Sequence, residues 1–260
     1  MPLKIRTYHD LTEPDRSGLV EQIGVQRRRV ADRLAAVGRV VAVLSGKGGV
    51  GKSFVTAGVA RALARAGRAV GVLDADLNGP TAARLLEAQG GPLAVVGDAV
   101  QPAVGAGGVK VVSMDQLLEE GRPLAFRGPE SESFVWRGAL EAAALREFLA
   151  DVAWGRLDLL LVDLPPGVQR FQELAELLPE PPAVLVVTIP TPESRDAVRR
   201  ALRAALEREA PPLGIVENMV GGGFCGDAAD ALAREFGIPV VARLPFDPAN
   251  AVWTELAARL

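Results

Sequence analysis

The fold of this chain is decided by the stretch Ser45-Gly46-Lys47-Gly48-Gly49-Val50-Gly51-Lys52-Ser53. The apolar run VVAVLS, from Val40 to Ser45, precedes the loop and predicts a buried strand, whereas the apolar spacing from Lys52 to Arg65 predicts a helix. A glycine-rich loop that follows a strand, ends in Lys-Ser and opens a helix is typical of a phosphate-binding P-loop. An ordinary glycine turn is the alternative, and the correct flanks on both sides argue against it.

Buried strands alternate with helical patterns along the rest of the chain. Apolar runs rich in β-branched residues predict further strands at Ala69–Asp74, Val109–Met114, Leu157–Asp163, Ala183–Ile189, Leu213–Glu217 and Val240–Leu244. Their continuous rather than alternating hydrophobicity is typical of strands covered on both faces by crossover helices. We therefore expect an α/β fold with a doubly wound, mainly parallel sheet.

The chain divides into two unequal parts on this reading. Residues 1–38 are interpreted as a polar tail and an entry helix, and residues 39–260 as the P-loop domain. Gly90–Gly108 is rich in Gly, Pro and Val and is interpreted as an irregular or hairpin insertion in that domain. The last stretch, Trp253–Leu260, has apolar residues at helical spacing but little positive charge, which favours packing on the domain over binding to a membrane.

Composition excludes several classes of function. The net charge of -3 is close to neutral, and the densest basic run, Arg27–Arg29, lies in a helix-like stretch, so no nucleic acid partner is implied. The chain has no apolar run long enough to span a membrane, and its first ten residues lack the apolar core of a secretory signal. We expect a cytoplasmic protein without a membrane partner. Cys225 is the sole cysteine, which excludes a disulfide within the chain.

The P-loop residues carry the predicted phosphate chemistry. Glycines let the backbone wrap a phosphate with converging N–H groups, and the start of the helix adds the positive end of its dipole. Lys52 should reach the β and γ phosphates of ATP, and the hydroxyl of Ser53 should be a ligand of Mg²⁺. The predicted nucleotide-binding residues of this segment are Gly46, Lys47, Gly48, Gly49, Val50, Gly51, Lys52, Ser53 and Phe54.

Two acidic positions complete the predicted site. Asp74 and Asp76 end one strand, and Asp163 ends the apolar run Leu159–Val162 and begins the sequence DLPPG. Carboxylates at the carboxyl ends of parallel strands point into the ligand crevice. The pattern around Asp163 is that of a Walker B motif, whose carboxylate holds Mg²⁺, and Pro165–Gly167 is interpreted as a switch that responds to the γ-phosphate. Aspartates at strand ends also cap helices, and this alternative stays open for Asp76 and Asp163.

Lys47 distinguishes this loop from an ordinary P-loop. A lysine directly after the first glycine resembles the signature lysine of the ParA/MinD class of deviant Walker A ATPases. The resemblance implies that Lys47 crosses a homodimer interface to the partner's nucleotide, whereas a solvated loop lysine is the alternative. It also implies that Asp76 orients the attacking water near Mg²⁺, with Asp74 in support. The predicted catalytic residues are thus Lys47, Lys52 and Asp76, and the predicted metal ligands are Ser53, Asp76 and Asp163.

Further stretches resemble the Mrp/ApbC branch of this class, the iron–sulfur cluster carrier ATPases. The resemblance extends from about Val40 to Pro248 and is carried by Asp74–Thr81, Val109–Met114, Phe126–Pro129, Phe148–Gly167, Ile215–Met219 and Leu244–Pro248. It implies that Asn218, in the IVENM stretch, contacts adenine. It also implies that the LPFDP loop, with Pro245 and Asp247, closes the adenine side of the site.

The chain departs from the family pattern at two places. The family's Cys-x-x-Cys after the IVENM strand is absent, and only Cys225 lies there. After DLPPG the chain has Val168-Gln169-Arg170 where the family usually has Thr-Gly-Asp. Two thiolates per dimer would hold a [4Fe–4S] cluster weakly, so we expect an ATP-hydrolysing protein without bound iron.

The expected function is a dimeric, Mg²⁺-dependent ATPase switch that serves as an assembly or carrier factor for an unidentified client protein. Two alternatives remain open. One is a spatial-positioning ATPase of the ParA/MinD type, and the other is a regulatory module that binds ATP without useful turnover.

Overall fold

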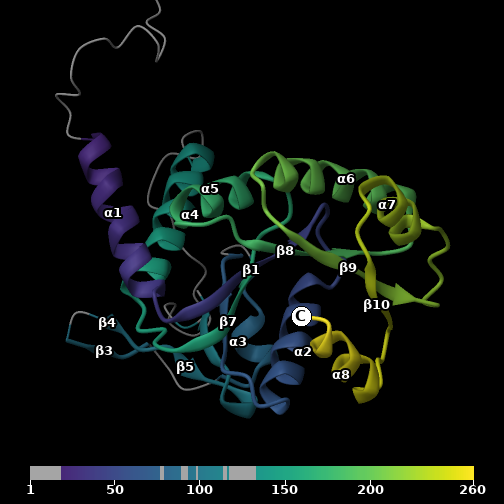
Figure 1. Ribbon diagram of the computed structural model, residues 1–260, viewed down its shortest axis with the longest axis horizontal. Coiled ribbons are helices and arrows are strands. Elements are labelled where there is room, and N and C mark those ends of the chain that lie inside the picture. The colour runs from purple at the N-terminus through teal and green to yellow at the C-terminus, as the bar shows by residue number, and fades with distance from the viewer. Residues whose placement is uncertain (1–18, 77–78, 89–92, 98, 114–115, 117–132) are drawn as a thin grey trace, which may run out of the picture.

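The computed structural model describes residues 19–76, 79–88, 93–97, 99–113, 116 and 133–260 (Figure 1). Residues 1–18 of the predicted tail lie outside the described residues, and so do Leu77–Asn78, Met114 and Phe126–Pro129 of the stretches quoted above. The helices are α1 (Leu19–Leu34), α2 (Lys52–Arg65), α3 (Ala82–Leu85), η2 (Ala106–Gly108), α4 (Ser133–Asp151), α5 (Gln169–Leu177), α6 (Pro192–Glu207), α7 (Ala228–Phe236) and α8 (Asn250–Ala258). The strands are β1 (Val37–Ser45), β2 (Val70–Asp74), β3 (Val95–Val96), β4 (Ala99–Val100), β5 (Ala103–Val104), β6 (Lys110–Ser113), β7 (Leu157–Asp163), β8 (Ala183–Thr188), β9 (Pro212–Val220) and β10 (Val240–Pro245).

One large sheet forms the centre of the molecule, with the strand order β10-β9-β8-β1-β7-β2-β6-β5. Neighbouring strands are parallel throughout except at the edge, where β5 pairs antiparallel with β6. The predicted mainly parallel, doubly wound α/β fold is therefore confirmed. Strand β1 lies between β7 and β8, so the loop that follows it opens near the middle of the sheet, where doubly wound folds bind ligands.

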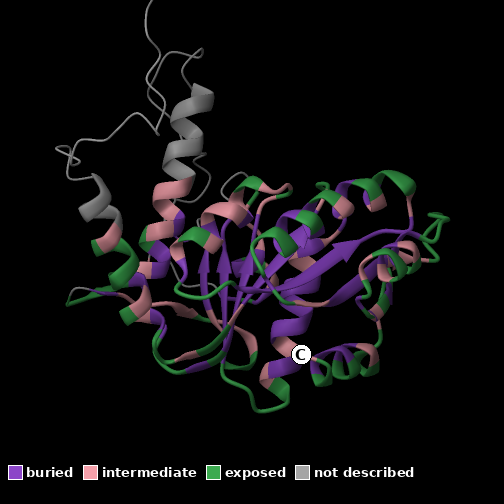
Figure 2. Cartoon of the chain, turned by 45° about the horizontal axis from the view of Figure 1, so that its top comes forward, coloured by how far each residue is buried: buried purple, intermediate pink, exposed green. Residues whose placement is uncertain are grey.

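Helices cover both faces of the sheet (Figure 1). Helices α1, α4, α5, α6 and α7 pack on one face, and α2, α3 and α8 pack on the other. Strands β1, β2, β6, β7, β8 and β9 are buried along most of their length (Figure 2). Successive residues of β1 alternate between two cores. Ala42 and Leu44 lie in the first core, and Val41 and Val43 lie in the second. The alternation explains why the strand has no polar residue between Val40 and Leu44.

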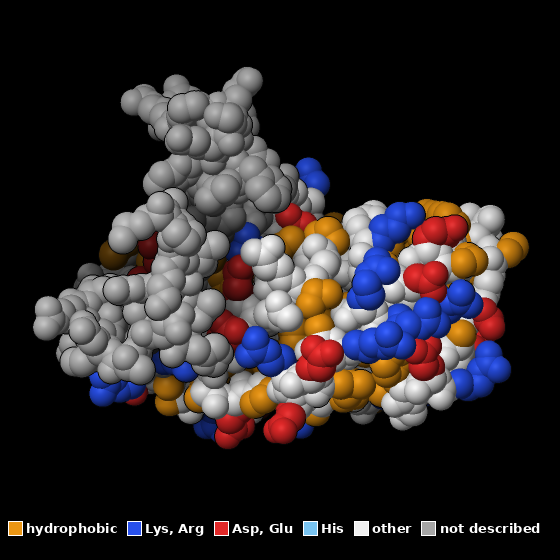
Figure 3. All heavy atoms as spheres, turned by 90° about the horizontal axis from the view of Figure 1, so that it is seen from above, with side chains coloured by type: hydrophobic (Ala, Val, Ile, Leu, Met, Phe, Trp, Pro, Cys, Tyr) orange, Lys and Arg blue, Asp and Glu red, His pale blue; other side chains and the backbone are white. Residues whose placement is uncertain are grey.

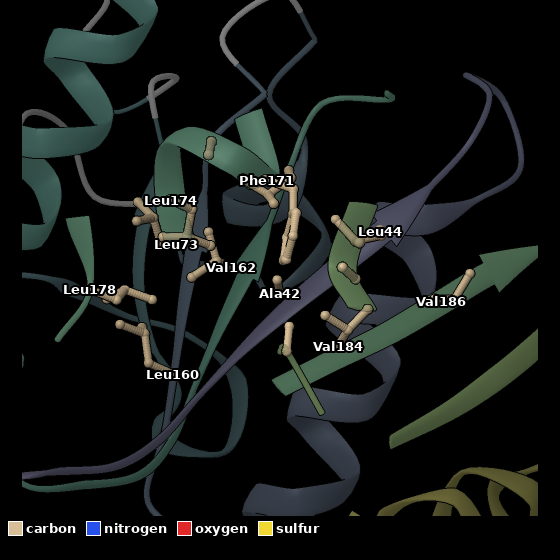
Figure 4. Packing of buried hydrophobic residues seen from close by; sticks show 14 of the residues in the cluster. Ala42, Leu44, Leu73, Leu160, Val162, Phe171, Leu174, Leu178, Val184 and Val186 are labelled. Carbon is tan, nitrogen blue, oxygen red and sulfur yellow. The ribbon is translucent and has the colours of Figure 1, made fainter. Parts of the chain in front are cut away.

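Helix α5 shows how the first core positions the segment that follows β7. Phe171 and Leu174 point from α5 toward side chains of the strands, including Leu44 and Val162 (Figure 4). All four side chains are buried almost completely. This packing holds the start of α5 close to the end of β1, where the glycine-rich loop begins.

The bounds of the predicted helix Lys52–Arg65 and of the predicted strand Leu157–Asp163 are confirmed. Strands β2, β6 and β8 are one or two residues shorter than predicted, whereas β1, β9 and β10 are longer because strand pairing extends them. Strand β1 starts at Val37, since Val37 and Arg39 pair with β7, and β9 continues to Val220, which pairs with Pro245 of β10. Asn218 therefore lies within a strand.

The insertion Gly90–Gly108 contains the predicted hairpin. Strands β3 and β4 pair antiparallel in a separate two-stranded sheet, and β5 then joins the edge of the large sheet. Strand β5 runs antiparallel to β6, so the insertion supplies the antiparallel strand of a sheet that is otherwise parallel.

Charges of both signs alternate on the face formed by α6 and α7 (Figure 3). Arg199 pairs with Asp196 and Glu235, and Arg203 pairs with the same Glu235. The face therefore has no uniform basic stripe. In the part of the chain that the structure describes, no helix is long and apolar enough to cross a lipid bilayer.

Candidate functional site

The glycine-rich loop connects β1 to α2, as predicted, and three of its glycines have a structural reason. Gly49 and Gly51 have φ angles of 80° and 77°, in the left-handed region where a side chain is strained. A Cβ on Gly46 would lie 2.2 Å from the carbonyl carbon of Ala197 in α6. Gly46 therefore allows α6 to approach the loop, and the other two glycines allow the loop to turn.

The start of α2 is open to an anion. Among the described residues, no side chain caps the first turn of α2, and this turn contains no acidic residue. The first N–H groups of a helix have no partner within the helix, so these donors and the helix dipole favour a negatively charged ligand. Lys47, Gly48 and Gly49 are exposed next to this helix start. The loop can therefore receive a phosphate from solvent.

Lys52 and Asp163 form a buried ion pair at the centre of the site. The Nζ atom of Lys52 lies 2.5 Å from Oδ1 of Asp163, and the two side chains are 6% and 0% exposed. Thr56, one helical turn after Lys52, donates its hydroxyl to the same Oδ1 at 3.1 Å. The structure thus brings together the predicted phosphate-binding lysine and the predicted Walker B carboxylate, which are 111 residues apart in the sequence.

The second oxygen of Asp163 fits a metal site. In the described part of the chain, Oδ2 of Asp163 is buried and has no hydrogen-bond partner. A buried carboxylate oxygen without a partner is costly, and a hydrated cation would satisfy it. Ser53 and Asp76, the other predicted ligands, are half-buried. Hydroxyl and carboxylate oxygens are the donors that Mg²⁺ prefers, so these three residues fit the predicted ion.

Asp74 organises the segment that follows β2. Its Oδ1 accepts a hydrogen bond from the N–H of Asp76 at 3.1 Å. Its Oδ2 accepts from the N–H groups of Thr81 and Ala82 at 2.8 and 2.9 Å and from the hydroxyl of Ser113 at 3.2 Å. Burial and the neighbouring charge of Asp163 raise the pKa of Asp74 to about 6, above its ordinary value of 3.8. Asp74 thus holds the position of Asp76 through the backbone.

The DLPPG segment lies against the P-loop. The N–H of Gly167 donates to the carbonyl of Ser45 at 3.2 Å, and Cγ of Pro166 lies 3.9 Å from the position of a Cβ on Gly48. Arg170, in the stretch that departs from the family pattern, pairs with Glu173 in α5, and its side chain is 11% exposed. The segment predicted to respond to the γ-phosphate is therefore in contact with the P-loop.

Asn218 contacts the P-loop directly. Its side chain is 3% exposed, and Nδ2 donates a hydrogen bond of 2.9 Å to the carbonyl of Val50. The sequence predicted an adenine contact for this residue but contained no signal for a bond to a residue 168 positions away. Pro245 and Asp247, the other residues predicted on the adenine side, are exposed at the end of β10, the strand next to β9.

Phe54 and Cys225 lie at the margins of the site. The Phe54 ring packs edge to face on Trp253 of α8, with ring centroids 5.6 Å apart and an angle of 67° between the planes. Cys225 is exposed in the glycine-rich loop after β9. Across the described residues, no group of three or more His, Cys, Asp or Glu side chains is arranged to hold a metal ion by itself.

Sequence reasoning missed some polar residues of the site. Thr56 and Ser113, which bond to Asp163 and Asp74, were not predicted. The position of Thr56, four residues after Lys52 on the same helix face, was the one available signal. Ser113 lies opposite Asp74 because β6 pairs with β2. The sequence does not specify which strands are neighbours, so this contact could not be predicted.

Comparisons with known proteins give a consistent result. A protein-family model described as ParA, NUBPL iron-transfer P-loop NTPase, matches residues 36–257. The iron-sulfur cluster carrier protein of Saccharolobus solfataricus is 34% identical over 89% of this chain and 79% of its own length. The human cytosolic Fe-S cluster assembly factor NUBP2 is 37% identical over 83% of this chain and 82% of its own length.

Solved structures agree with the sequence comparisons. A nucleotide-binding protein of Archaeoglobus fulgidus, solved in complex with ADP, has a TM-score of 0.69 and 33% identity, and the match covers 89% of this chain and 91% of that one. The septum site-determining protein MinD of Pyrococcus horikoshii, complexed with Mg-ADP, has a TM-score of 0.59 and 18% identity over 84% of this chain and 94% of its own. The second likeness concerns the fold alone.

Proposed function

Because the chain belongs to the family of NUBPL-type iron-transfer P-loop NTPases, we propose that it is a Mg²⁺-dependent ATPase that works as a nucleotide-gated dimer in iron–sulfur cluster assembly. The observation that carries this proposal is the open start of α2 beside the buried pair of Lys52 and Asp163. A helix start without a cap and a lysine that can be drawn to phosphate form a site for a nucleotide's phosphates. Relatives above 30% identity are named as cluster carriers or assembly factors, and this favours assembly over spatial positioning.

ATP binding would rearrange the ion pair. The β and γ phosphates would lie over the N–H groups of the P-loop, and the ammonium group of Lys52 would turn from Asp163 toward them. The carboxylate of Asp163 then loses its cation and becomes available to a metal ion. Phosphate binding and metal binding are therefore linked through one buried lysine.

Ser53, Asp76 and Asp163 would hold Mg²⁺, directly or through water, since their oxygens fit this ion. Bound Mg²⁺ would neutralise charge on the β and γ phosphates. Asp76 would orient and polarise the attacking water, and the bond from its N–H to Asp74 would keep it in place. Lys47 is exposed at the rim of the site, which supports a role on the nucleotide of a partner subunit.

We propose that this chain does not hold a stable iron–sulfur cluster with its own residues alone. A [4Fe–4S] cluster takes four thiolates as a rule, and the single Cys225 gives a symmetric dimer two. A client's cysteines would have to complete the ligand set of any cluster that passes through the dimer. Several relatives, the human NUBP2 among them, have names that include the word cytosolic, and we place the protein in the cytoplasm on this ground.

Phosphate release from ATP tests the catalytic proposal. Asp76→Asn should bind ATP normally and lose turnover by about a hundredfold or more, because an amide of the same size cannot serve as a base. Asp32→Asn, at an exposed position on α1, is the matched control and should keep full turnover. Equal turnover of Asp76→Asn and the control would assign the catalytic role elsewhere.

Anaerobic reconstitution with iron and sulfide tests the cluster proposal. We expect little bound iron in the purified dimer, and Cys225→Ser should retain both ATP binding and hydrolysis. A stable brown protein with about four irons per dimer, colourless in Cys225→Ser, would refute this part and make the chain a full cluster carrier.

A further inference from the structure

The carboxyl end of β9 connects the P-loop to the loop that holds Cys225. Glu217, Asn218 and Met219 follow one another there. Asn218 and Met219 contact the P-loop, and Glu217 contacts α7 and Arg243. We infer that this strand end transmits the nucleotide state of the P-loop to the segment Gly221–Asp227, with Asn218 as the positioning residue. The inference rests on the proposed function, because it assumes that a nucleotide occupies the P-loop.

The first contact of the strand end is made by Asn218 to the P-loop. Its Nδ2 donates to the carbonyl of Val50 at 2.9 Å, and a Cβ on Gly51 would lie only 2.3 Å from the same Nδ2. The loop and the amide are therefore packed without a gap. A carboxamide has two N–H donors and one acceptor, so one donor and the acceptor remain for the adenine contact predicted for Asn218. One side chain can thus respond both to the base and to the loop.

The second contact concerns the backbone of Met219. This residue has a φ angle of 59°, and the glycines that follow, Gly221 and Gly223, have φ angles of 78° and 84°. A left-handed methionine is strained and persists only where its surroundings hold it. The surroundings include the P-loop, because Cε of Met219 lies 3.5 Å from the Cβ position of Gly51. Movement of the loop would therefore change the support of this strained residue.

The third contact anchors the far end of the Cys225 loop. Oε1 of Glu217 accepts from the N–H of Ala229 in the first turn of α7 at 3.3 Å, and Oε2 accepts from Arg243 at 3.1 Å. Glu217 is 5% exposed. Between these anchors, Gly222 lies against the ring of Phe246, since a Cβ there would be 2.1 Å from the ring. The segment Gly221–Asp227 is thus held by β9 at both ends, at its start by the chain itself and at its end through Glu217. A shift of β9 would therefore move both ends of the segment.

The single thiol provides a direct readout of the loop. Cys225 is exposed and is the sole cysteine of the chain, so the rate of its reaction with N-ethylmaleimide reports on this loop alone. The rate is measured without nucleotide, with Mg-ADP and with a slowly hydrolysed ATP analogue. Protein concentrations at which gel filtration shows a monomer prevent dimer formation from shielding the thiol. We expect saturating nucleotide to change the rate by about fivefold or more, in either direction.

Substitution of Asn218 tests the route. Asn218→Ala removes the bond to Val50, and Met219→Gly removes the backbone strain. In each variant, the rate at which Cys225 reacts with N-ethylmaleimide should be nearly the same with saturating ADP as without it. Asn250→Ala is the matched control, because it changes an exposed asparagine of α8 and should keep the rate change of the unaltered protein. Circular dichroism and a fluorescent ADP establish that each variant folds and binds.

The outcomes separate this inference from the proposed function. If the unaltered protein binds no nucleotide, the proposed function fails. If it binds nucleotide and the thiol rate does not change, only the coupling is refuted. If the rate changes equally in Asn218→Ala, Met219→Gly and the unaltered protein, the signal takes another route and β9 is not the transmitting element.

Discussion

Lys52 is held by Asp163 in the interior, and this makes the usual test of a P-loop lysine ambiguous. Removing one partner of a buried ion pair leaves an uncompensated charge, so Lys52→Ala should lower the free energy of unfolding by roughly 3 kcal/mol or more, in addition to abolishing ATP binding. Denaturant unfolding measures the first effect, and binding of a fluorescent ATP analogue measures the second.

A double substitution separates the two effects. Lys52→Met combined with Asp163→Asn removes both charges, so most of the lost stability should return while ATP binding stays absent. A Lys52→Ala protein as stable as the unaltered one would contradict the buried pair. Near-normal ATP affinity in either variant would contradict the assignment of the phosphate site.

Asp74 makes the stability of the nucleotide-free protein depend on pH. Its pKa is about 6 in the folded protein and is ordinarily 3.8, so the folded state holds this proton more tightly than the unfolded state. The contribution to stability is complete below about pH 4 and is lost as the pH rises through 6, with a size of about 3 kcal/mol.

Asp74→Asn provides the comparison, because an amide does not titrate in this range. From pH 4 to pH 7 the free energy of unfolding should fall more in the unaltered protein than in the variant. Denaturant unfolding at each pH measures this difference. Parallel pH profiles for the two proteins would show that Asp74 does not carry this proton.

At the scale of elements, α8 is fitted to the P-loop helix by one glycine. A Cβ on Gly58 of α2 would lie 2.4 Å from the ring of Trp253, which also contacts Phe54. Gly58→Ala should therefore displace the ring and destabilise the protein by about 1–3 kcal/mol, despite the better helix propensity of alanine. Because α8 follows the loop with Pro245 and Asp247, the variant should also bind ATP more weakly, as titration with a fluorescent analogue would measure.

Gly24 provides the matched control for this prediction. It also lies inside a helix, α1, but a Cβ there meets no atom within 4 Å. Gly24→Ala should be neutral or stabilise the protein by about 0.5 kcal/mol. If Gly58→Ala is as stable and binds ATP as tightly as Gly24→Ala, the packing of Trp253 does not position the adenine-side loop.

At the scale of the whole molecule, the proposed dimer requires two chains to complete one site. Lys47→Ala should keep most of its ATP affinity and lose most hydrolysis, because the exposed lysine would act on the partner's nucleotide. Mixing Lys47→Ala with Asp76→Asn, each inactive alone, should restore hydrolysis, since a heterodimer has one site with both residues. About a quarter of the normal rate is expected from an equal mixture.

Both variants in this mixture keep Lys52 and can bind ATP, so the heterodimer is loaded in both subunits. For the unaltered protein, a specific ATPase activity that rises with protein concentration would support the dimer independently. Full hydrolysis by Lys47→Ala alone would refute the role of this lysine in trans.

Much of this protein was predictable from its sequence because the deciding signals are local. The glycine-rich loop, the bounds of α2 and β7 and the parallel sheet all follow from short-range patterns of glycine, apolar and β-branched residues. The predicted site residues that follow β1 and β2 and that end β7 lie at one edge of the sheet, because the carboxyl ends of parallel strands meet there.

Tertiary structure alone decided which of these groups touch. The partner of Lys52, the bond from Asn218 to Val50 and the fit of Gly58 to Trp253 each join residues that are at least 111 positions apart in the sequence. The order of the strands in the sheet brings them together. The raised pKa of Asp74 likewise depends on burial beside Asp163 on a neighbouring strand. Periodicity specifies the type of each element and its apolar face, but contacts between faces depend on packing, which the sequence of one element does not contain.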